Sequence, residues 1–163
     1  MTADLSALRI VLADDTPLIC DLLSGVLQSV GVKEIRIARS GQAALDTLSK
    51  WAADILFLDW EMGSMSGLEV VKTIRESYCN VDPCLPIIMT TAHSEESKVI
   101  AARSAGVHEY LMKPFTGKAV LARLAAVVND DRPFIRTETY FGPAPRPTRV
   151  RTGPSLRSQK SHD

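Results

Sequence analysis

The sequence predicts an α/β fold built on one parallel sheet, and three features of the chain support this. Short apolar runs alternate five times with segments of helical spacing between residues 9 and 129. The run from residue 55 to 58 is apolar throughout, which is typical of a strand covered on both faces. The helical segments are long enough for the crossovers that parallel strands need. Five strands and five helices in three layers follow from this pattern.

The first repeat begins with a β-rich run at residues 9–13, which ends in two acids. Pro17 suits the first turn of a helix, and the apolar spacing after it continues to Val30. Gly31 suits the end of this helix. The next run, residues 34–38, predicts a second and more exposed strand.

The middle of the chain continues the alternation. A helix is predicted over residues 41–51, and three of its apolar residues are expected to face inward: Ala44, Leu45 and Leu48. Residues 55–58 then form the buried third strand. The glycines and serines of residues 63–67 predict a loop, and residues 68–78 predict the third helix.

The fourth repeat has a buried strand at residues 87–90, followed by a helix over residues 94–105. Ser94 is the expected N-cap, and two acids in the first turn suit the helix dipole. Gly106 suits the end of this helix.

The fifth repeat consists of a short strand at residues 109–112 and a last helix over residues 116–129, capped by Thr116. Right-handed crossovers leave few topologies for five such repeats. The expected strand order is therefore 2-1-3-4-5, that of flavodoxin-like sheets.

Polar residues stand at the carboxyl ends of four predicted strands. Asp14 and Asp15 follow the first strand, Asp59 the third, Thr90 and Thr91 the fourth, and Lys113 the fifth. Ligands of doubly wound sheets bind beyond these strand ends. The fold therefore predicts one crevice that gathers three carboxylates, two hydroxyls and an amine.

Three carboxylates at close range repel one another unless a cation neutralises them or protons are shared. Hard oxygen ligands with room for water favour Mg²⁺. Asp59, on the central strand, is best placed to act as a nucleophile that forms an aspartyl-phosphate. Lys113 and Thr91 are expected to bind the phosphoryl oxygens.

Five short motifs occur in the order of the predicted strands: LADD from Leu12, LDWEM from Leu58, SGLE from Ser66, MTTA from Met89 and YLMKPF from Tyr110. As a set they resemble the receiver domains of two-component response regulators, in particular single-domain, chemotaxis-type regulators. The resemblance covers residues 7–129. One departure is Gly63, where the family usually has proline.

The resemblance implies a function for the chain. A sensor histidine kinase or phosphotransfer protein would pass a phosphoryl group to Asp59, with Mg²⁺ as cofactor. The regulator would then signal through a downstream protein target or as a phosphorelay intermediate. It would catalyse only its own phosphorylation and dephosphorylation, so it would not be an enzyme in the ordinary sense.

The resemblance also implies roles for single residues. Asp15, Asp59 and the main-chain carbonyl of Glu61 would ligate Mg²⁺, and Asp14 would help through water. Thr91 and Tyr110 would form the switch pair, and the bond between Lys113 and Pro114 would be cis.

Two further positions flank the expected site, each two residues beyond a key residue. Glu61 follows the acceptor, and His93 follows the switch threonine. In such domains these positions influence how water reaches the phosphoryl group, so both are expected to tune its lifetime.

The composition divides the chain into a receiver domain at residues 1–130 and a basic, proline-rich extension at residues 131–163. The chain has 19 basic and 19 acidic residues; seven and two of these lie in residues 132–163, which leaves 12 and 17 in residues 1–131. So short a proline-rich segment cannot build a helix-turn-helix domain, and no specific DNA binding is expected.

Several roles stay open for the extension. It could be a solvated tail, or it could touch nucleic acid nonspecifically through its arginines. It could also be an arm that docks on a partner or a second copy through four residues: Phe134, Ile135, Tyr140 and Phe141. A homodimer is expected either through this arm or through the face formed by the fourth helix, fifth strand and fifth helix.

A second class of function is a small Mg²⁺-dependent enzyme, such as a phosphatase or phosphotransferase acting on an outside substrate. The sequence has neither the DxDxT motif nor a cap-sized insertion that such an enzyme would want. Its three cysteines are expected to be reduced thiols, although a pair of Cys79 and Cys84 is conceivable. We find no signal peptide and no apolar run of about 20 residues, so a cytoplasmic protein without a membrane contact is expected.

Overall fold

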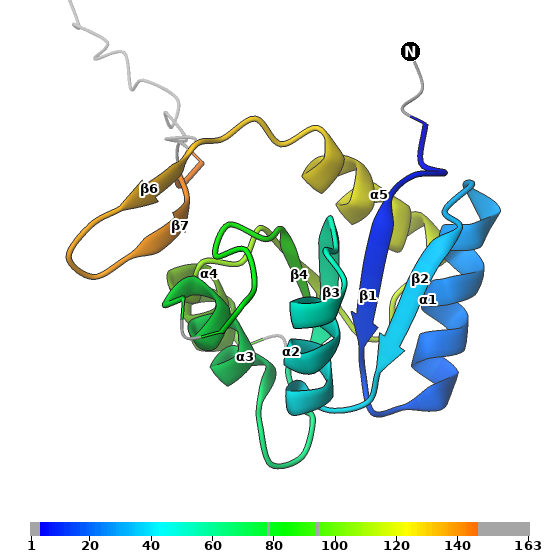
Figure 1. Cartoon of the computed structure of the whole chain (residues 1–163), viewed down its shortest axis with the longest axis horizontal. Helices are drawn as coiled ribbons and strands as arrows, with labels where there is room; N and C mark the ends of the chain where they lie inside the picture. Colours follow the sequence, from blue (N-terminus) through cyan, green and yellow to red (C-terminus); the bar gives the residue numbers. More distant parts are fainter. Residues whose placement is uncertain (1–3, 78, 94, 147–163) are drawn as a thin grey trace, which may run out of the picture.

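The computed structural model describes residues 4–77, 79–93 and 95–146, and it confirms the predicted α/β architecture. One sheet holds five parallel strands in the predicted order, β2-β1-β3-β4-β5. The strands are β1 (Arg9–Ala13), β2 (Glu34–Ala38), β3 (Ile55–Asp59), β4 (Ile87–Thr91) and β5 (Glu109–Met112). Since β1 and β3 are paired neighbours, their carboxyl ends lie side by side (Figure 1).

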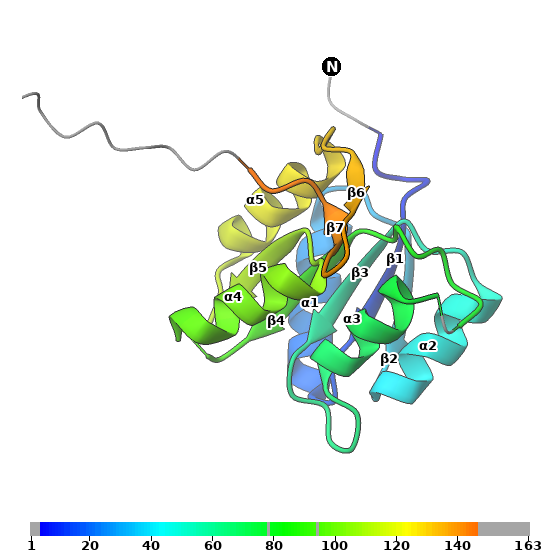
Figure 2. The same cartoon turned by 90° about the vertical axis from the view of Figure 1, so that its left-hand side faces the viewer.

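Five helices cover the two faces of the sheet and complete the three layers (Figures 1 and 2). They are α1 (Pro17–Ser29), α2 (Gly41–Lys50), α3 (Gly67–Arg75), α4 (Glu96–Ala105) and α5 (Gly117–Val128). Leu23 of α1 and Val120 of α5 share one apolar core with Phe57. Helices α2, α3 and α4 build the other core around β3 and β4.

Every residue of β3 and β4 is buried, as the apolar run at residues 55–58 predicts. In α2 the three residues expected to face inward are all buried: Ala44, Leu45 and Leu48. Burying one large apolar side chain such as Phe57 stabilises the fold by about 1.5–3 kcal/mol. The two central strands are thus held rigidly, and this fixes the positions of the residues at their carboxyl ends.

The third helix differs most from its predicted bounds. It ends at Arg75, three residues early, because Ser77 takes a φ of 61°, in the left-handed region that a helix excludes. It begins one residue early, at Gly67. Ser66 caps it by accepting a hydrogen bond from Glu69 N, and the Glu69 side chain accepts one from Ser66 N in return.

The predicted caps of the last two helices have different outcomes. Thr116 caps α5 as predicted, because its Oγ1 accepts a hydrogen bond of 3.1 Å from Ala119 N. Helix α4 begins at Glu96, with Glu95 as the preceding residue. The predicted cap, Ser94, lies outside the described residues. The other boundaries agree with the predicted ones or differ from them by one residue.

After α5 the chain folds back as an antiparallel hairpin of β6 (Phe134–Arg136) and β7 (Phe141–Pro143). The sequence indicated a β-favouring stretch and left open that its aromatic residues dock on a partner, which stays a prediction. Within this chain Phe134 packs on Phe141 and on His108, with ring centroids 5.4 and 5.3 Å apart.

Arg75 joins this hairpin to the rest of the domain. The side chain is 3% exposed, and it donates hydrogen bonds to the carbonyls of Gly106 (3.0 Å) and Pro83 (2.7 Å). Its guanidinium lies 5.0 Å from the ring centre of Phe134. Burial lowers the pKa of Arg75 to about 10, so the group remains charged at neutral pH. The hairpin is therefore held by a buried cation and an aromatic ring.

None of the helices in the described part of the chain has both the length and the apolarity needed to cross a bilayer. Cys20, Cys79 and Cys84 are free thiols. The division at residue 130 stays a prediction, although the hairpin packs closely on the preceding elements.

Candidate functional site

The site begins with three aspartates at the ends of β1 and β3. The two strands are paired in register, with Ala13 opposite Leu58, so Asp14 and Asp59 follow at the same level. Asp14 and Asp59 are buried and Asp15 is exposed. One carboxylate oxygen from each of the three lies within 4.8 Å of the others. The predicted gathering of these carboxylates is therefore present.

Lys113 comes to the same place from the end of β5. Its Nζ lies 3.0 Å from Asp14 Oδ2 and 3.2 Å from Asp59 Oδ1. The main chain holds the lysine there, because Lys113 N donates a 2.8 Å hydrogen bond to the carbonyl of Thr91. The bond between Lys113 and Pro114 is cis, as the resemblance implied.

The clustered charges alter the acidity of two groups. Burial and the nearby charge of Asp14 raise the pKa of Asp59 to about 6, against the opposing effect of Lys113. Burial tends to lower the pKa of Lys113, but the hydrogen bond to Asp14 and the charge of Asp59 outweigh it and raise this pKa. The two carboxylates therefore stabilise the charged form of Lys113. The charge of Lys113 does not fully offset the burial of Asp59 and the repulsion from Asp14.

Two backbone features position Asp59. Trp60 N donates to the carbonyl of Thr90 at 2.9 Å, and Gly67 N donates to the carbonyl of Trp60 at 2.8 Å. A Cβ at Gly67 would overlap the carbonyl oxygen of Asp59. Helix α3 can thus begin directly beneath the acceptor only because residue 67 has no side chain.

The predicted switch pair meets at the main chain of His93. Thr91 is buried, and its Oγ1 accepts a 3.1 Å hydrogen bond from His93 N. The hydroxyl of Tyr110 donates a 2.7 Å hydrogen bond to the carbonyl of His93. Burial raises the pKa of Tyr110, which therefore stays protonated as a donor at neutral pH. The two side chains share one neighbouring residue, which is the arrangement a coupled pair requires.

Glu61 and His93 pair directly with each other across the loops that follow β3 and β4. The hydrogen bond with His93 and the histidine's charge lower the pKa of Glu61. Sequence reasoning treated these residues separately and missed their contact. The available signal was an acidic and a basic side chain two residues beyond the ends of adjacent strands.

Sequence reasoning also missed the local support of Asp14. Its Oδ1 accepts a 2.9 Å hydrogen bond from Thr16 N, and its carbonyl accepts one from the Cys20 thiol at 3.5 Å. No motif predicts either contact. An Asp at a strand end is commonly followed by a helix start of this kind, so the pattern does not single out these two bonds.

The family model for the response regulator receiver domain matches residues 10–125 of the chain. This match begins within β1, ends within α5 and includes the three clustered aspartates. The chain belongs to the response regulator receiver family.

Similar proteins support a chemotaxis-like receiver. A chemotaxis protein CheY homolog of Campylobacter jejuni (strain 81-176) is 33% identical over 122 residues, which cover 74% of this chain and 92% of that protein. The crystal structure of Vibrio cholerae chemotaxis protein CheY4 at low pH is 32% identical, with a TM-score of 0.66, and the match covers 74% of this chain and 99% of that one.

A more distant structure is similar in fold alone. A CheY-like receiver domain protein from Methanospirillum hungatei JF-1 is 23% identical, with a TM-score of 0.65 over 72% of this chain and 90% of its own. Receivers of this family are signalling proteins rather than conventional enzymes, and they interact with histidine kinases and downstream targets.

The donor set of this receiver fits Mg²⁺. Mg–O distances of about 2.0–2.1 Å place neighbouring ligand oxygens about 3 Å apart and opposite ones about 4 Å apart. The three carboxylate oxygens, within 4.8 Å of one another, need only small shifts to reach that spacing. The ligands are hard oxygens and Asp15 is exposed, which leaves room for the waters that Mg²⁺ retains.

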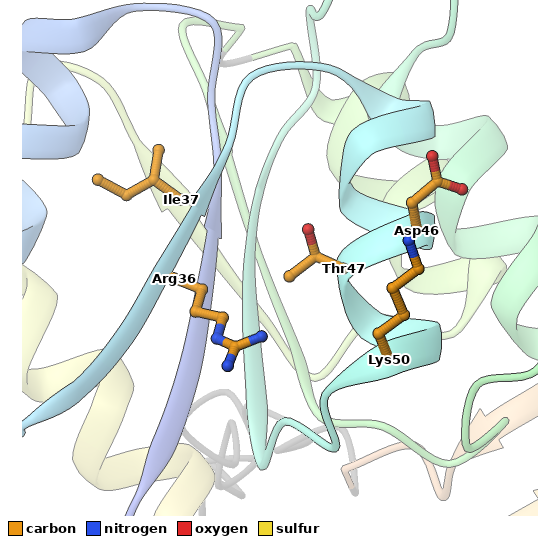
Figure 3. Close-up of a pocket in the computed structure, with 5 residues that line it drawn as sticks. All are labelled: Arg36, Ile37, Asp46, Thr47 and Lys50. Atoms are coloured by element: carbon orange, nitrogen blue, oxygen red, sulfur yellow. The ribbon is translucent and has the colours of Figure 1, made fainter.

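A separate shallow hollow of about 370 Å³ lies between β2 and α2 (Figure 3). Its lining residues are Arg36, Ile37, Asp46, Thr47 and Lys50. None of the three clustered aspartates belongs to it. The receiver site is therefore recognised by its charges and strand ends rather than by the size of a cavity.

Proposed function

We propose that this receiver accepts a phosphoryl group on Asp59 from a sensor histidine kinase or a phosphotransfer protein and then signals through protein contacts. The observation that carries the proposal is the position of Lys113 Nζ, 3.0 Å from Asp14 and 3.2 Å from Asp59. A cation at this point can neutralise both the attacking carboxylate and the incoming phosphoryl oxygens.

In the proposed transfer, an Oδ atom of Asp59 attacks phosphorus while the P–N bond of the donor phosphohistidine breaks. The bond electrons return to the imidazole, which takes up a proton. Phosphoryl transfer depends mainly on positioning and charge neutralisation, so a fixed carboxylate and a nearby ammonium are the groups that it needs.

Asp15, Asp59 and the main-chain carbonyl of Glu61 would hold Mg²⁺, with Asp14 acting through water. When bound, the ion supplies positive charge that offsets the carboxylates and the transferred phosphoryl group. Lys113 and Thr91 would bind the oxygens of the phosphorylated Asp59.

The proposed output is a shift of population between two states of the domain. Movement of Thr91 toward the phosphoryl group would break its hydrogen bond with His93 N. Tyr110 bonds to the carbonyl of the same residue, so its position would change with that of Thr91. Glu61 and His93 would set the lifetime by controlling the approach of water.

The altered surface would be the face of α4, β5 and α5, which would bind a downstream protein or a second copy of the chain. We place this signalling in the cytoplasm. The receiver would occupy residues 1–130, and the extension at residues 131–163 would carry no effector domain of its own.

The test is labelling by acetyl phosphate in the presence of Mg²⁺. Asp59→Asn should abolish the label, and Asp46→Asn should leave it unchanged, because Asp46 lies on α2 away from the cluster. Label that persists on the first variant would reject Asp59 as the acceptor. Repeated turnover of a phosphorylated metabolite, rather than one label per chain, would favour the enzyme class instead.

A further inference from the structure

The hairpin of β6 and β7 packs on the turn that leads from α4 into β5. Phe134 of β6 lies against His108, with ring centroids 5.3 Å apart. Gly142 of β7 packs so closely on Gly106 that a Cβ at Gly142 would lie 2.8 Å from Gly106 Cα. Both contacts fall just before β5 begins, at the end of the strand opposite to the acidic cluster (Figure 1).

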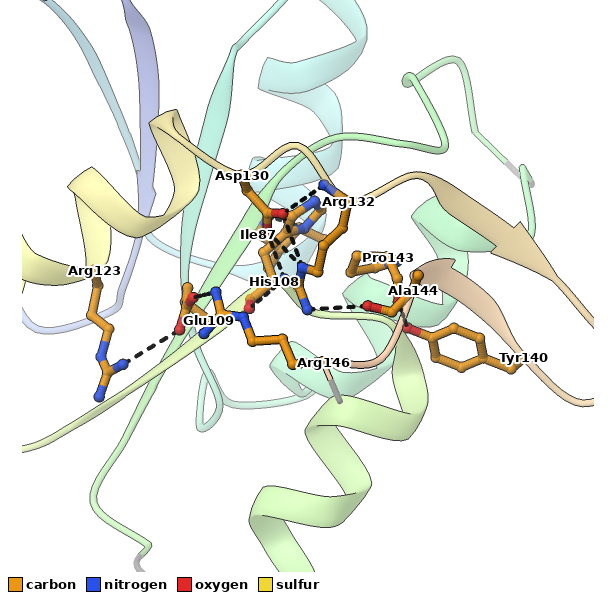
Figure 4. Close-up of polar contacts among 10 residues, drawn as sticks. All are labelled: Ile87, His108, Glu109, Arg123, Asp130, Arg132, Tyr140, Pro143, Ala144 and Arg146. Atoms are coloured by element: carbon orange, nitrogen blue, oxygen red, sulfur yellow. Dashed lines mark hydrogen bonds and ion pairs between the residues drawn. The ribbon is translucent and has the colours of Figure 1, made fainter. Parts of the chain in front are cut away.

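Polar contacts from both flanks of the hairpin hold the same segment. Before β6, Arg132 donates a 3.4 Å hydrogen bond to the carbonyl of His108 and pairs with Asp130 at 2.6 Å (Figure 4). After β7, Arg146 pairs at 2.5 Å with Glu109, the first residue of β5. The start of β5 is therefore restrained by the hairpin and by the residues on either side of it.

Strand β5 connects these contacts to the phosphoacceptor site. It is an edge strand, so it pairs only with β4 in the described sheet. Its second residue is Tyr110, whose hydroxyl bonds to the carbonyl of His93. Lys113, whose Nζ lies 3.2 Å from Asp59 Oδ1, directly follows its last residue. A shift of this strand would therefore move both Tyr110 and Lys113.

Closure of the hairpin buries a charged group that is not fully paired. The guanidinium of Arg75 lies 5.0 Å from the ring centre of Phe134, and the residue is 3% exposed. No ion pair among the described residues includes Arg75, and its Nη2 has no hydrogen-bond partner there. A buried donor without a partner favours opening, which would let water reach it. This contribution narrows the free-energy gap between the closed and the open hairpin, as a latch requires.

We propose that the hairpin is a latch, which in its closed position restrains β5 and opposes the phosphorylated state of the receiver. The latch rests on the proposed phosphoryl transfer to Asp59. Because coupling between two sites is reciprocal, phosphorylation of Asp59 would in turn favour the open hairpin. The receiver would then be regulated from the end of the sheet that lies opposite its acceptor.

Hydrogen exchange of the full chain, followed by mass spectrometry, measures opening of the hairpin. Thr137 N and Ala144 N donate main-chain hydrogen bonds of 2.7 and 2.8 Å, so their amides are protected while the hairpin is closed. Acetyl phosphate with Mg²⁺ should speed exchange in residues 133–146 at least threefold, and Asp59→Asn should show no such change. Unchanged exchange in a chain that carries the label would overturn the proposal.

Two variants weaken the latch in the full chain. Phe134→Ala removes the ring over Arg75, and Gly142→Ala adds a Cβ that overlaps Gly106. Each should speed exchange of the hairpin at least fivefold. Each should also raise the initial rate of labelling by acetyl phosphate at least twofold, because that rate follows the fraction of chains in the competent state. An unchanged or slower rate in variants whose hairpin is open would overturn the proposal.

The matched controls are Leu18→Ala and Gly25→Ala, both on α1. Leu18 is 74% exposed, and nothing lies within 4 Å of a Cβ at Gly25, so neither change should alter exchange or labelling. A rate that rises as much in the controls as in the latch variants would overturn the proposal. Protection of the β3 amides shows that a variant is folded, and if one latch variant loses it, the other decides the outcome.

The results separate failure of the latch from failure of the proposed function. Absence of label on the unmodified chain would reject phosphoryl transfer to Asp59 and the latch with it. Label on the unmodified chain, with hairpin exchange unchanged by the label and no faster labelling of Phe134→Ala or Gly142→Ala, would reject the latch alone.

Discussion

Lys113 donates a hydrogen bond to Asp14 across 99 residues of sequence, with Nζ 3.0 Å from Oδ2. The same nitrogen lies 3.2 Å from Asp59 Oδ1. The lysine therefore lies where the acidic cluster stabilises its positive charge. It must share that field with any divalent ion that binds there, because both are attracted by the same carboxylates.

Competition between these cations gives the first prediction. Lys113→Met should bind Mg²⁺ about tenfold more tightly, a gain of about 1.4 kcal/mol, because a positive charge close to the ion is removed. It should also lose labelling by acetyl phosphate. Quenching of Trp60, next to Asp59, reports the affinity. Lys72→Met, on the exposed surface of α3, serves as the control. An unchanged Mg²⁺ affinity would contradict this prediction.

The raised pKa of Asp59 predicts how stability depends on pH without Mg²⁺. The folded chain binds a proton at Asp59 between pH 3.8 and about 6, whereas the unfolded chain releases it at the lower value. The stability that the folded chain gains from a protonated Asp59 is thus fully present below pH 3.8. This stability is lost as the pH rises through about 6.

The free energy of unfolding of Asp59→Asn should therefore be about 2 kcal/mol higher than that of the unmodified chain at about pH 7. Near about pH 3.5 the variant and the unmodified chain should be equally stable. Urea unfolding over this pH range measures the difference. Saturating Mg²⁺ should reduce the gap by stabilising only the chain that retains the aspartate. A gap that is constant with pH would count against the raised pKa.

Gly67 predicts a steric effect on the acceptor. Gly67→Ala should destabilise the fold by about 2–3 kcal/mol, because the new Cβ meets the backbone at Asp59 and Trp60. Gly63→Ala meets open space and has only the strain of its φ of 69°, about 1 kcal/mol. Chemical unfolding measures the loss of stability in both variants. Equal losses would contradict this prediction.

The pair of Glu61 and His93 predicts an effect on lifetime. It links the two loops beside the acceptor, so breaking it should open the site to water. We expect Glu61→Gln and His93→Gln each to shorten the aspartyl-phosphate lifetime about threefold, and the double variant to add little. Decay of the label after removal of the donor measures this. The control is Glu95→Gln, and decay at the original rate in both single variants would refute the role.

Much of the fold was predictable because local signals agreed with one another. The apolar run at residues 55–58 became a fully buried strand, and the Thr116 cap formed as expected. The end of α3 was not predictable, since the positive φ of Ser77 leaves no mark in the residue type. The packing of the hairpin on the domain was also not predictable, because its aromatic residues, read alone, suit any apolar partner.

The sequence by itself determined which chemical groups stand at the ends of the strands, because strand ends and turns follow from short-range patterning. It thereby specified the acidic cluster, the lysine and the likeness to receivers. Only the tertiary structure decided which of these groups touch. The contact of Phe134 with His108, for example, depends on side-chain packing between segments that are separate in the chain, and no local pattern encodes such packing.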